Sequence, residues 1–153
     1  MICLFAGFQL YTQPTEDMRE VRRTLCGVHE RTRVSRNFEF ELVNDERGHC
    51  VDDDDNTYSF GAFEDVKTYT DCAERCVDDG DAGFRGIEFD CSNNVCKCLY
   101  DPDVDINNGV FDNTGSGDGE GPIEDTLSSH HLVYCGALAD DMEVQVESKA
   151  AIA

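Results

Sequence analysis

The stretch DCAERCVDDGDAGFRGIEFDCSNNVCKCLYD, residues 71–101, holds five of the chain's nine cysteines. Cys72 and Cys76 lie four residues apart among good helix formers, so both thiols leave one face of a predicted helix. Thr70 suits the N-cap of this helix and Gly80 its end. The stretch is therefore expected to begin with a short helix that presents two thiols to one side.

Beyond this helix the hydrophobic period changes to two, which is typical of strands. Ile87 and Phe89 alternate with small or charged residues, and Cys96 and Cys98 alternate with their neighbours in the same way. The turn-forming residues 92–94 join the two runs. A β-hairpin is therefore expected to follow the helix.

Helix and hairpin have matching cysteine spacings. Cysteines two apart on a strand lie roughly 6 to 7 Å apart on one face, and cysteines four apart on a helix are separated by roughly 6 Å. Each cysteine of the helix can therefore form a disulfide with one cysteine of the strand, and we favour Cys72 with Cys98 and Cys76 with Cys96. A local bridge from Cys91 to Cys96 and a bridge from Cys76 to Cys91 remain open.

The cysteine usage is typical of an oxidising compartment. We expect an extracellular or cell-surface protein, although no signal peptide is visible in the sequence. Structural zinc is the alternative, but the paired Cys-x-x-Cys spacings of such sites are missing. Because nine is an odd number, one thiol at least is free or paired between chains, and Cys3 and Cys26 are expected to pair with each other or with a neighbouring chain.

In the order of these elements the chain resembles the PAN/apple family, in which a helix carrying Cys-x-x-x-Cys precedes a Gly-Phe strand and a strand that ends with cysteine and leucine. Over residues 50–136 the resemblance implies an α+β fold, with a short helix packed on a small antiparallel sheet, and an outer bridge between Cys50 and Cys135. The chain departs from the family at Ala82, where a cysteine is usual, and it adds Cys91 and Cys96. The matching elements are Cys72 to Cys76, Gly83-Phe84 to Phe89, and Cys98-Leu99.

The flanking segments are expected to lie outside this domain. Residues 1–49 are predicted to form an N-terminal extension, and residues 137–153 a C-terminal strand or tail in which Val144 and Val146 alternate with polar residues. Edge segments at both ends of a chain favour pairing with another copy. The extension is read as a strand at 2–11, an amphipathic helix built on Met18, Val21, Leu25 and Val28, and an edge strand at 37–43.

The formal charge of −21 is unevenly distributed. Residues 1–49 hold seven arginines against eight acidic residues, whereas residues 50–153 hold five basic against twenty-five acidic residues. Such a surface repels phosphate backbones and anionic lipid, so we expect neither nucleic-acid binding nor membrane insertion. Cations and basic proteins are favoured, although solubility alone also explains the charge.

An acidic, glycine-rich loop is predicted between Leu99 and Leu127. Its alternating Asp101, Asp103 and Asp105 resemble the start of a calcium loop, in which carboxylate oxygens at alternate positions surround the cation. The match is partial, because an EF-hand requires Gly at the position of Ile106 and Glu at that of Asp112. We expect no required cofactor, and calcium is the candidate ion. The run 52–55 is a second candidate, for which an exposed turn is the simpler reading.

The sequence contains no nucleophile elbow, HExxH motif, P-loop or dinucleotide fingerprint. We therefore expect no enzyme. The PAN/apple resemblance implies a non-enzymatic binding module for protein or carbohydrate ligands, and Tyr58, Arg85 and Tyr100 are the candidate ligand contacts, since aromatics stack on sugar rings and arginine binds carboxylates. The alternative is a structural subunit of an extracellular oligomer or filament formed through the terminal segments.

Overall fold

The computed structural model describes residues 21, 23–44, 47–78, 83–106, 109–129 and 131–139. Within these residues the chain folds into antiparallel sheets, the helix α3 and a helical turn at 23–25, all cross-linked by four disulfides. This composition agrees with a small disulfide-rich α+β domain. The elements are β1 (Arg31–Ser35), β2 (Phe38–Leu42), β3 (His49–Val51), β4 (Ser59–Phe63), α3 (Tyr69–Asp78), β5 (Phe84–Asp90), β6 (Val95–Tyr100), β7 (Asn113–Gly115), β8 (Asp125–Leu127) and β9 (Val133–Leu138).

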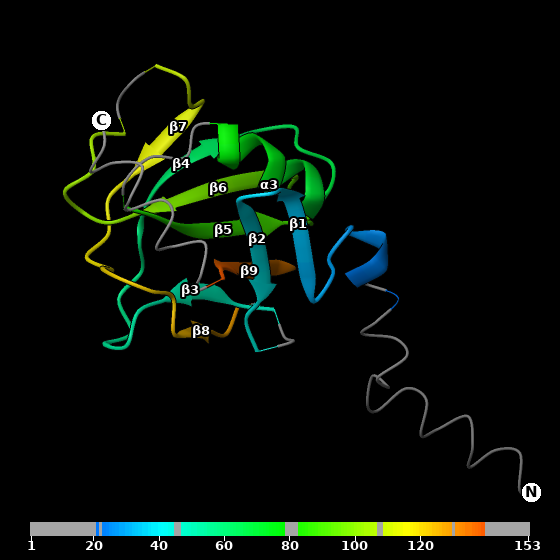
Figure 1. Cartoon of the computed structure of the whole chain (residues 1–153), viewed down its shortest axis with the longest axis horizontal. Coiled ribbons are helices and arrows are strands. Elements are labelled where there is room, and N and C mark those ends of the chain that lie inside the picture. The colour runs from blue at the N-terminus through cyan, green and yellow to red at the C-terminus, as the bar shows by residue number, and fades with distance from the viewer. Residues whose placement is uncertain are drawn as a thin grey trace, which may run out of the picture.

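Seven strands form one antiparallel sheet in the order β1-β2-β9-β5-β6-β4-β7. The last strand of the described chain, β9, thus lies inside the sheet, between β2 and β5 (Figure 1). The short strands β3 and β8 form a separate antiparallel pair, which lies beyond β9 in Figure 1. Helix α3 packs on one face of the sheet, where it contacts β1, β5 and β6.

The start of α3 is set by Thr68, whose hydroxyl accepts the backbone N–H of Asp71 at 3.1 Å. The N-cap is therefore Thr68 and not Thr70, so the helix begins at Tyr69. One face of the helix is fully buried against the sheet, with spacings of three and four residues that match the helical period. That face consists of Tyr69, Cys72, Ala73 and Cys76, each 0% exposed.

The hairpin predicted after the helix is confirmed as β5 and β6, but the favoured disulfide pairing is wrong. The structure joins Cys72 to Cys96 and Cys76 to Cys98. The reason is direction: α3 runs the same way as β6, so the first cysteine of the helix meets the first cysteine of the strand. The favoured pairing requires the two elements to run in opposite directions.

Two further bridges fasten segments that are distant in sequence. Cys50 in β3 is joined to Cys135 in β9, which is the pair that the family resemblance implied. Cys26 is joined to Cys91 at the end of β5, so Cys26 pairs within the chain, and neither local bridge considered for Cys91 forms. Each disulfide contributes about 2 to 4 kcal/mol to stability, mainly by restricting the unfolded chain.

The N-terminal extension supplies two strands to the common sheet. The strand predicted at 37–43 is confirmed as β2, but β2 is not the edge, because β1 pairs with its other side. The apolar face predicted for the N-terminal helix is not uniformly buried, since Val21 and Leu25 are 58% and 79% exposed and Val28 lies beyond the helical turn. The strand predicted at 2–11 and most of the segment 137–153, including 143–147, lie outside the described residues.

A hydrophobic core lies on each face of the sheet. The main core lies between the sheet and α3 and includes Phe40, Phe84, Phe89 and Tyr100. A second, smaller core lies on the opposite face, where Leu99 and Ile123 pack with Tyr58 and the bridge formed by Cys50. Burying each large apolar side chain contributes roughly 1.5 to 3 kcal/mol. The second core fixes the segments that carry the site described next.

Candidate functional site

The segment between β7 and β8, residues 116–124 and called the strap below, is fastened to the body along its length. This part of the predicted acidic loop is thus hydrogen-bonded to the body of the domain. At its start, the Ser59 hydroxyl donates to the Gly117 carbonyl and accepts the Gly117 N–H, both at 3.1 Å, and the Gly119 N–H donates to the Thr57 carbonyl at 2.8 Å. In its middle, the Tyr58 hydroxyl donates to the Gly121 and Pro122 carbonyls at 2.8 and 3.0 Å. At its end, the Glu124 N–H donates to the Val51 carbonyl at 3.0 Å.

The glycines of the strap allow this close approach. A Cβ atom at Gly117 would overlap the backbone of Thr57 and Tyr58, and one at Gly119 would come within 2.9 Å of the Thr57 carbonyl oxygen. Gly121 adopts a φ of +77°, which favours glycine. The glycine-rich composition therefore serves tight contact with the body in addition to turning the chain.

Asp52 anchors both the strap and the turn beside it. Its carboxylate accepts the backbone N–H groups of Asp54 at 3.0 Å, Asn56 at 2.9 Å and Glu120 at 3.2 Å. These bonds, led by that from Asn56, hold the pKa of the Asp52 carboxyl below its ordinary value. Asp52 is only 4% exposed, so this residue of the run 52–55 is a structural acceptor.

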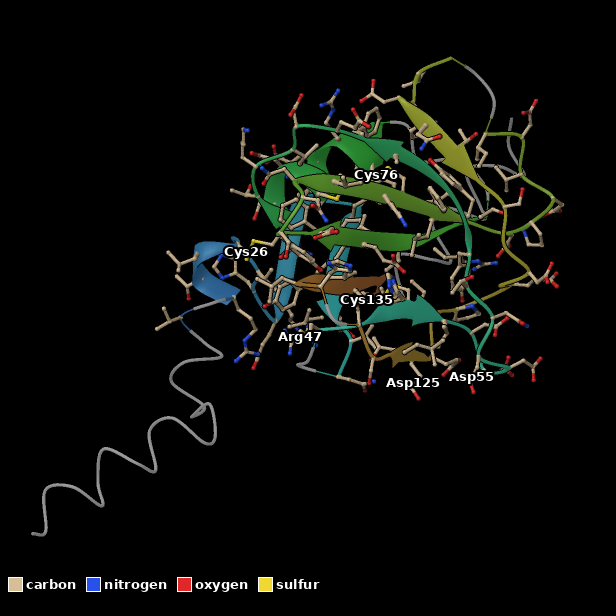
Figure 2. The ribbon with its side chains drawn as sticks, turned by 180° about the vertical axis from the view of Figure 1, so that it is seen from behind. Cys26, Arg47, Asp55, Cys76, Asp125 and Cys135 are labelled. Atoms are coloured by element: carbon tan, nitrogen blue, oxygen red, sulfur yellow. A yellow bond between two sulfur atoms is a disulfide. The ribbon has the colours of Figure 1, made fainter. Side chains whose placement is uncertain are left out.

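The outward side chains of the turn at 53–55, of the strap and of the first residue of β8 form a surface that we call the acidic ridge. Figure 2 shows Asp55 and Asp125 along the same border of the molecule. No lysine or arginine occurs between Arg47 and Lys67 or between Lys97 and Lys149. Of the ion pairs formed among the described residues, none involves the ridge. The ridge consists of the exposed carboxylates of Asp53, Asp54, Asp55, Asp118, Glu120, Glu124 and Asp125.

Arg85, predicted as a ligand contact, is instead bound within the domain. Its guanidinium donates two hydrogen bonds to the carboxylate of Asp101, at 3.0 and 2.8 Å, and both side chains are largely buried. The same carboxylate accepts the N–H of Gly121 at 2.9 Å, so the ion pair also fastens the strap. A charge-assisted bidentate pair of this kind is a strong positioning element.

The two tyrosines predicted as ligand contacts are buried. Tyr58 is 3% exposed and Tyr100 is 2% exposed, so neither ring presents a face for a sugar to stack on. Tyr100 packs between Phe84 and Phe111, with ring centroids 5.5 and 6.3 Å away. The prediction failed because aromatic residues at strand ends supply core area as readily as they supply a surface.

The structure does not bring Asp101, Asp103 and Asp105 together as metal ligands. Asp101 is held by Arg85, and within the described ranges the three carboxylates do not form a group of ligand atoms within 4.8 Å of one another. The group that does satisfy this distance is Cys72, Cys76 and Cys96, whose sulfurs are already joined in disulfides.

A histidine and a buried glutamate meet on the sheet face opposite α3. Glu88 is 6% exposed; its carboxylate accepts the Cys50 N–H at 2.7 Å and lies 3.2 Å from His49 Nδ1. The bond to Glu88 raises the pKa of His49, against the opposing effect of burial. Sequence reasoning missed this pair, because 39 residues separate its members and neither belongs to a recognisable motif.

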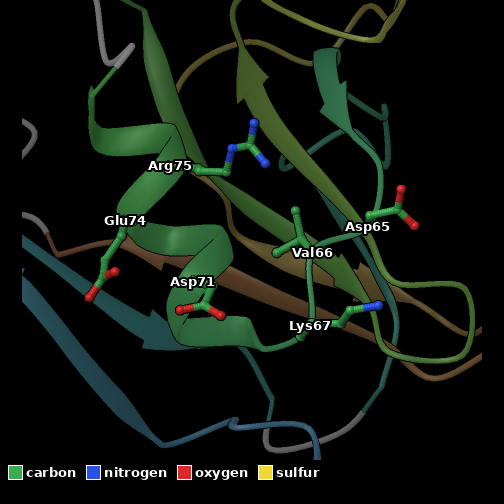
Figure 3. A pocket seen from close by; sticks show the side chains of 6 residues that line it. All are labelled: Asp65, Val66, Lys67, Asp71, Glu74 and Arg75. Atoms are coloured by element: carbon green, nitrogen blue, oxygen red, sulfur yellow. The ribbon is translucent and has the colours of Figure 1, made fainter.

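A hollow of about 360 Å³ lies beside the start of α3 (Figure 3). Its charges nearly cancel, because three carboxylates face two cations, and the Arg75 guanidinium is 4.3 Å above the Phe63 ring. It therefore offers no strong preference for a charged ligand. The residues that line it are Asp65, Val66, Lys67, Asp71, Glu74 and Arg75.

No family model matches the chain, and searches of curated proteins and of solved structures found no match. In the part of the chain that the structure describes, no helix is long and apolar enough to span a membrane.

Proposed function

We propose that this chain is a non-enzymatic extracellular binding module of the PAN/apple type, which recognises a basic protein through the acidic ridge. The class is supported by the two disulfides that join α3 to β6 and by the outer Cys50–Cys135 bridge. Four disulfides are typical of proteins that work in an oxidising, extracellular environment.

One observation carries the assignment of the ligand: the strap is fastened to the body by several hydrogen bonds, while its carboxylates form no ion pair with any residue that the structure describes. Asp52, Ser59, Tyr58 and Asp101 each bind the strap backbone. A ligand that binds a preorganised surface does not have to supply the cost of ordering it. Adjacent unpaired carboxylates repel one another, and a cationic partner relieves this repulsion.

A protein ligand is favoured over a carbohydrate because of the burial of Tyr58 and Tyr100. Phe60, which is half-buried, is covered by the Lys97 ammonium at 4.3 Å from the ring centroid. Aromatic surface for sugar stacking is therefore scarce on these segments, whereas carboxylates are plentiful. A basic protein presents several cationic side chains, which also explains why the ridge contains several acidic residues and not one.

The test uses an octalysine peptide as a defined cationic probe, with binding followed by fluorescence anisotropy. The triple variant Asp118→Asn, Glu120→Gln and Glu124→Gln is expected to weaken binding at least tenfold. Raising the salt from about 50 to 300 mM is expected to weaken the binding of the unaltered protein as well, because exposed charges are screened. Octaserine is the uncharged probe and is expected not to bind.

The matched control removes the same number of charges elsewhere, at the exposed residues Glu30, Glu64 and Glu74, each changed to Gln. It is expected to bind octalysine within about twofold of the unaltered chain. An equal loss in both triple variants would mean that net charge alone attracts the probe and would overturn the ridge. A glycan array that shows binding unaffected by the ridge variant would favour the carbohydrate alternative.

A further inference from the structure

The outer edge of β1 is a basic border on an acidic molecule. Arg31, Arg33 and Arg36 fall within six residues of a chain whose net charge is −21. Among the described strands none pairs with this edge, because β1 is the outermost strand of the sheet. An unpaired edge presents N–H and C=O groups that accept a further strand.

The register of the hairpin shows which groups point outward. The Leu42 N–H donates to the Glu30 carbonyl at 2.8 Å, so these two residues form a hydrogen-bonded pair across the hairpin. Antiparallel pairs alternate between bonded and non-bonded, so Thr32 also directs its backbone toward β2. The backbone groups of Arg31 and Arg33 therefore face the free edge.

The side chains of β1 alternate between a buried or apolar set and an exposed, basic set. Thr32 is 5% exposed and Val34 packs on the main core, whereas Arg31 and Arg33 lie on the exposed side. Arg31 binds Glu41 at 3.1 Å, but Arg33 has no ion pair within the described residues. A second β1 strand would place arginines against arginines, which is unfavourable. The edge therefore suits a strand that is acidic on one side and aliphatic on the other.

We propose that the segment 143–147 of a second copy of this chain adds to the edge of β1 as an antiparallel strand. The sequence Glu-Val-Gln-Val-Glu alternates in the required way. Direct neighbours across a strand pair share a face, and diagonal neighbours lie within reach of long side chains. With Gln145 opposite Arg33, Val146 falls beside Thr32 and Glu147 beside Arg31, where β1 pairs regularly with β2. Val144 and Glu143 fall beside Val34 and Ser35, where the pairing of β1 is shifted by a bulge between Arg33 and Ser35. The two glutamates thus flank Arg33.

The length of the chain indicates that the added strand comes from a second copy and not from the same chain. The Ala139 N–H donates to the Glu39 carbonyl at 3.0 Å, so Ala139 lies beside β2. The new strand would lie three strand spacings from β9, about 14 Å away. Four residue steps from Ala139 to Glu143 span at most ~14 Å in a straight line. The segment 139–143 of the same chain is therefore too short to pass around the turn at 36–37 and reach the edge of β1. The segment of a neighbouring copy is not limited by this distance.

The first test measures association of the full chain by sedimentation velocity. The unaltered protein is expected to self-associate, either as a reciprocal dimer or as a longer assembly, and Arg33→Glu is expected to raise the dissociation constant on the order of tenfold. The double variant Glu143→Arg and Glu147→Arg is expected to lose association similarly. Mixing it with Arg33→Glu is expected to restore association between the two variants. A strict monomer at millimolar concentration overturns the proposal, and so does self-association that none of these variants changes.

The second test separates the two possible sources of the strand. The variant Arg33→Lys keeps the charge and supplies an amine that a carbodiimide can link to Glu143 or Glu147. In an equal mixture of unlabelled and ¹⁵N-labelled protein, linked peptides of mixed isotopic composition are expected. Linked peptides from a single isotope only would show that the chain folds back on itself and would overturn the proposal. Neither test depends on octalysine binding, so this proposal and the ridge can fail separately.

Discussion

The hydroxyl of Tyr69 fills the space that a side chain at Gly136 would need. Tyr69 lies on the buried face of α3, is 0% exposed, and has no hydrogen-bond partner for its oxygen among the described residues. Burial also raises the pKa of this phenol far above its ordinary value, so the group stays neutral. Helix and sheet are thus brought together by a contact that requires glycine in β9.

We expect Gly136→Ala to destabilise the protein by about 1 to 3 kcal/mol, because a well-packed core must shift to admit one methyl group. Tyr69→Phe is expected to restore part of this loss, since it removes the oxygen that the methyl group would overlap. Alone, Tyr69→Phe removes an unpaired buried hydroxyl and is expected to be neutral or stabilising. Denaturant unfolding of the two single variants and the double variant measures the coupling. Strict additivity would contradict the contact.

We expect Cys98→Ser to lead to a rearranged disulfide. The change frees Cys76, whose sulfur lies 3.5 Å from that of Cys96. The Cys76 thiolate can attack Cys96, which forms a Cys76–Cys96 bond and releases the thiolate of Cys72. Peptide mapping after thiol blocking is expected to find both pairings.

The matched control for this exchange is Cys135→Ser. It frees Cys50, which has no cluster of neighbouring cysteine sulfurs in the described part of the chain. We expect Cys50 to remain a free thiol with the other three bridges unchanged. If Cys72–Cys96 is the only bridge found among Cys72, Cys76 and Cys96 after Cys98→Ser, the short sulfur contact does not lead to exchange.

The His49–Glu88 pair is expected to make stability depend on pH. Glu88 is the largest influence and raises the pKa of His49, with Asp90 acting in the same direction and Lys97 and burial opposing it. Because the pKa of His49 is higher in the folded than in the unfolded protein, the charged form of His49 stabilises the fold. This stabilisation is fully present below the unfolded-state pKa near 6.5 and is lost as the pH rises through the folded-state pKa. Because His49 is partly exposed, we expect less than about 1 kcal/mol.

The measurement compares the unaltered protein with His49→Gln at pH 5.5 and pH 8.5. The difference in unfolding free energy between the two proteins is expected to be larger at pH 5.5. The comparison cancels the general effect of protonating the many carboxylates. An equal difference at both pH values would mean that the His49 charge does not act on folding.

Asp52→Asn is expected to loosen the strap. The carboxylate accepts three backbone N–H groups, and an amide nitrogen in its place would present a donor to at least one of them. Hydrogen exchange within residues 117–124 is expected to become faster. The control is Asp53→Asn, which alters an exposed neighbour and is expected to leave the exchange of the strap unchanged.

Local periodicity was sufficient to predict α3, β2 and the β5–β6 hairpin. It does not predict β1, although Thr32 and Val34 alternate with Arg31 and Arg33 and the turn at 36–37 completes a hairpin. The disulfide pairing also had a signal in the sequence. Short connections reverse the chain direction at each step, so β6 must run parallel to α3.

The site was less predictable than the fold. Tyr58 and Arg85 are predicted as ligand contacts and Asp101 as a metal ligand, but in the structure all three bind the backbone of the strap or one another. Which face a tyrosine or an arginine turns toward depends on partners that are distant in sequence. Gly121, for example, is 20 residues from Asp101 and 63 from Tyr58.

The position of β9 has a consequence for biosynthesis. This strand is the last to leave the ribosome among those described, yet it joins the β1–β2 hairpin to the other four strands and carries the partner of Cys50. Until residues 133–138 emerge, the nascent chain holds two separate sheet fragments with exposed edges and an unpaired thiol. Folding of this domain is therefore expected to be completed only after nearly all of it has been translated, so premature termination before β9 is expected to leave an aggregation-prone product rather than a smaller domain.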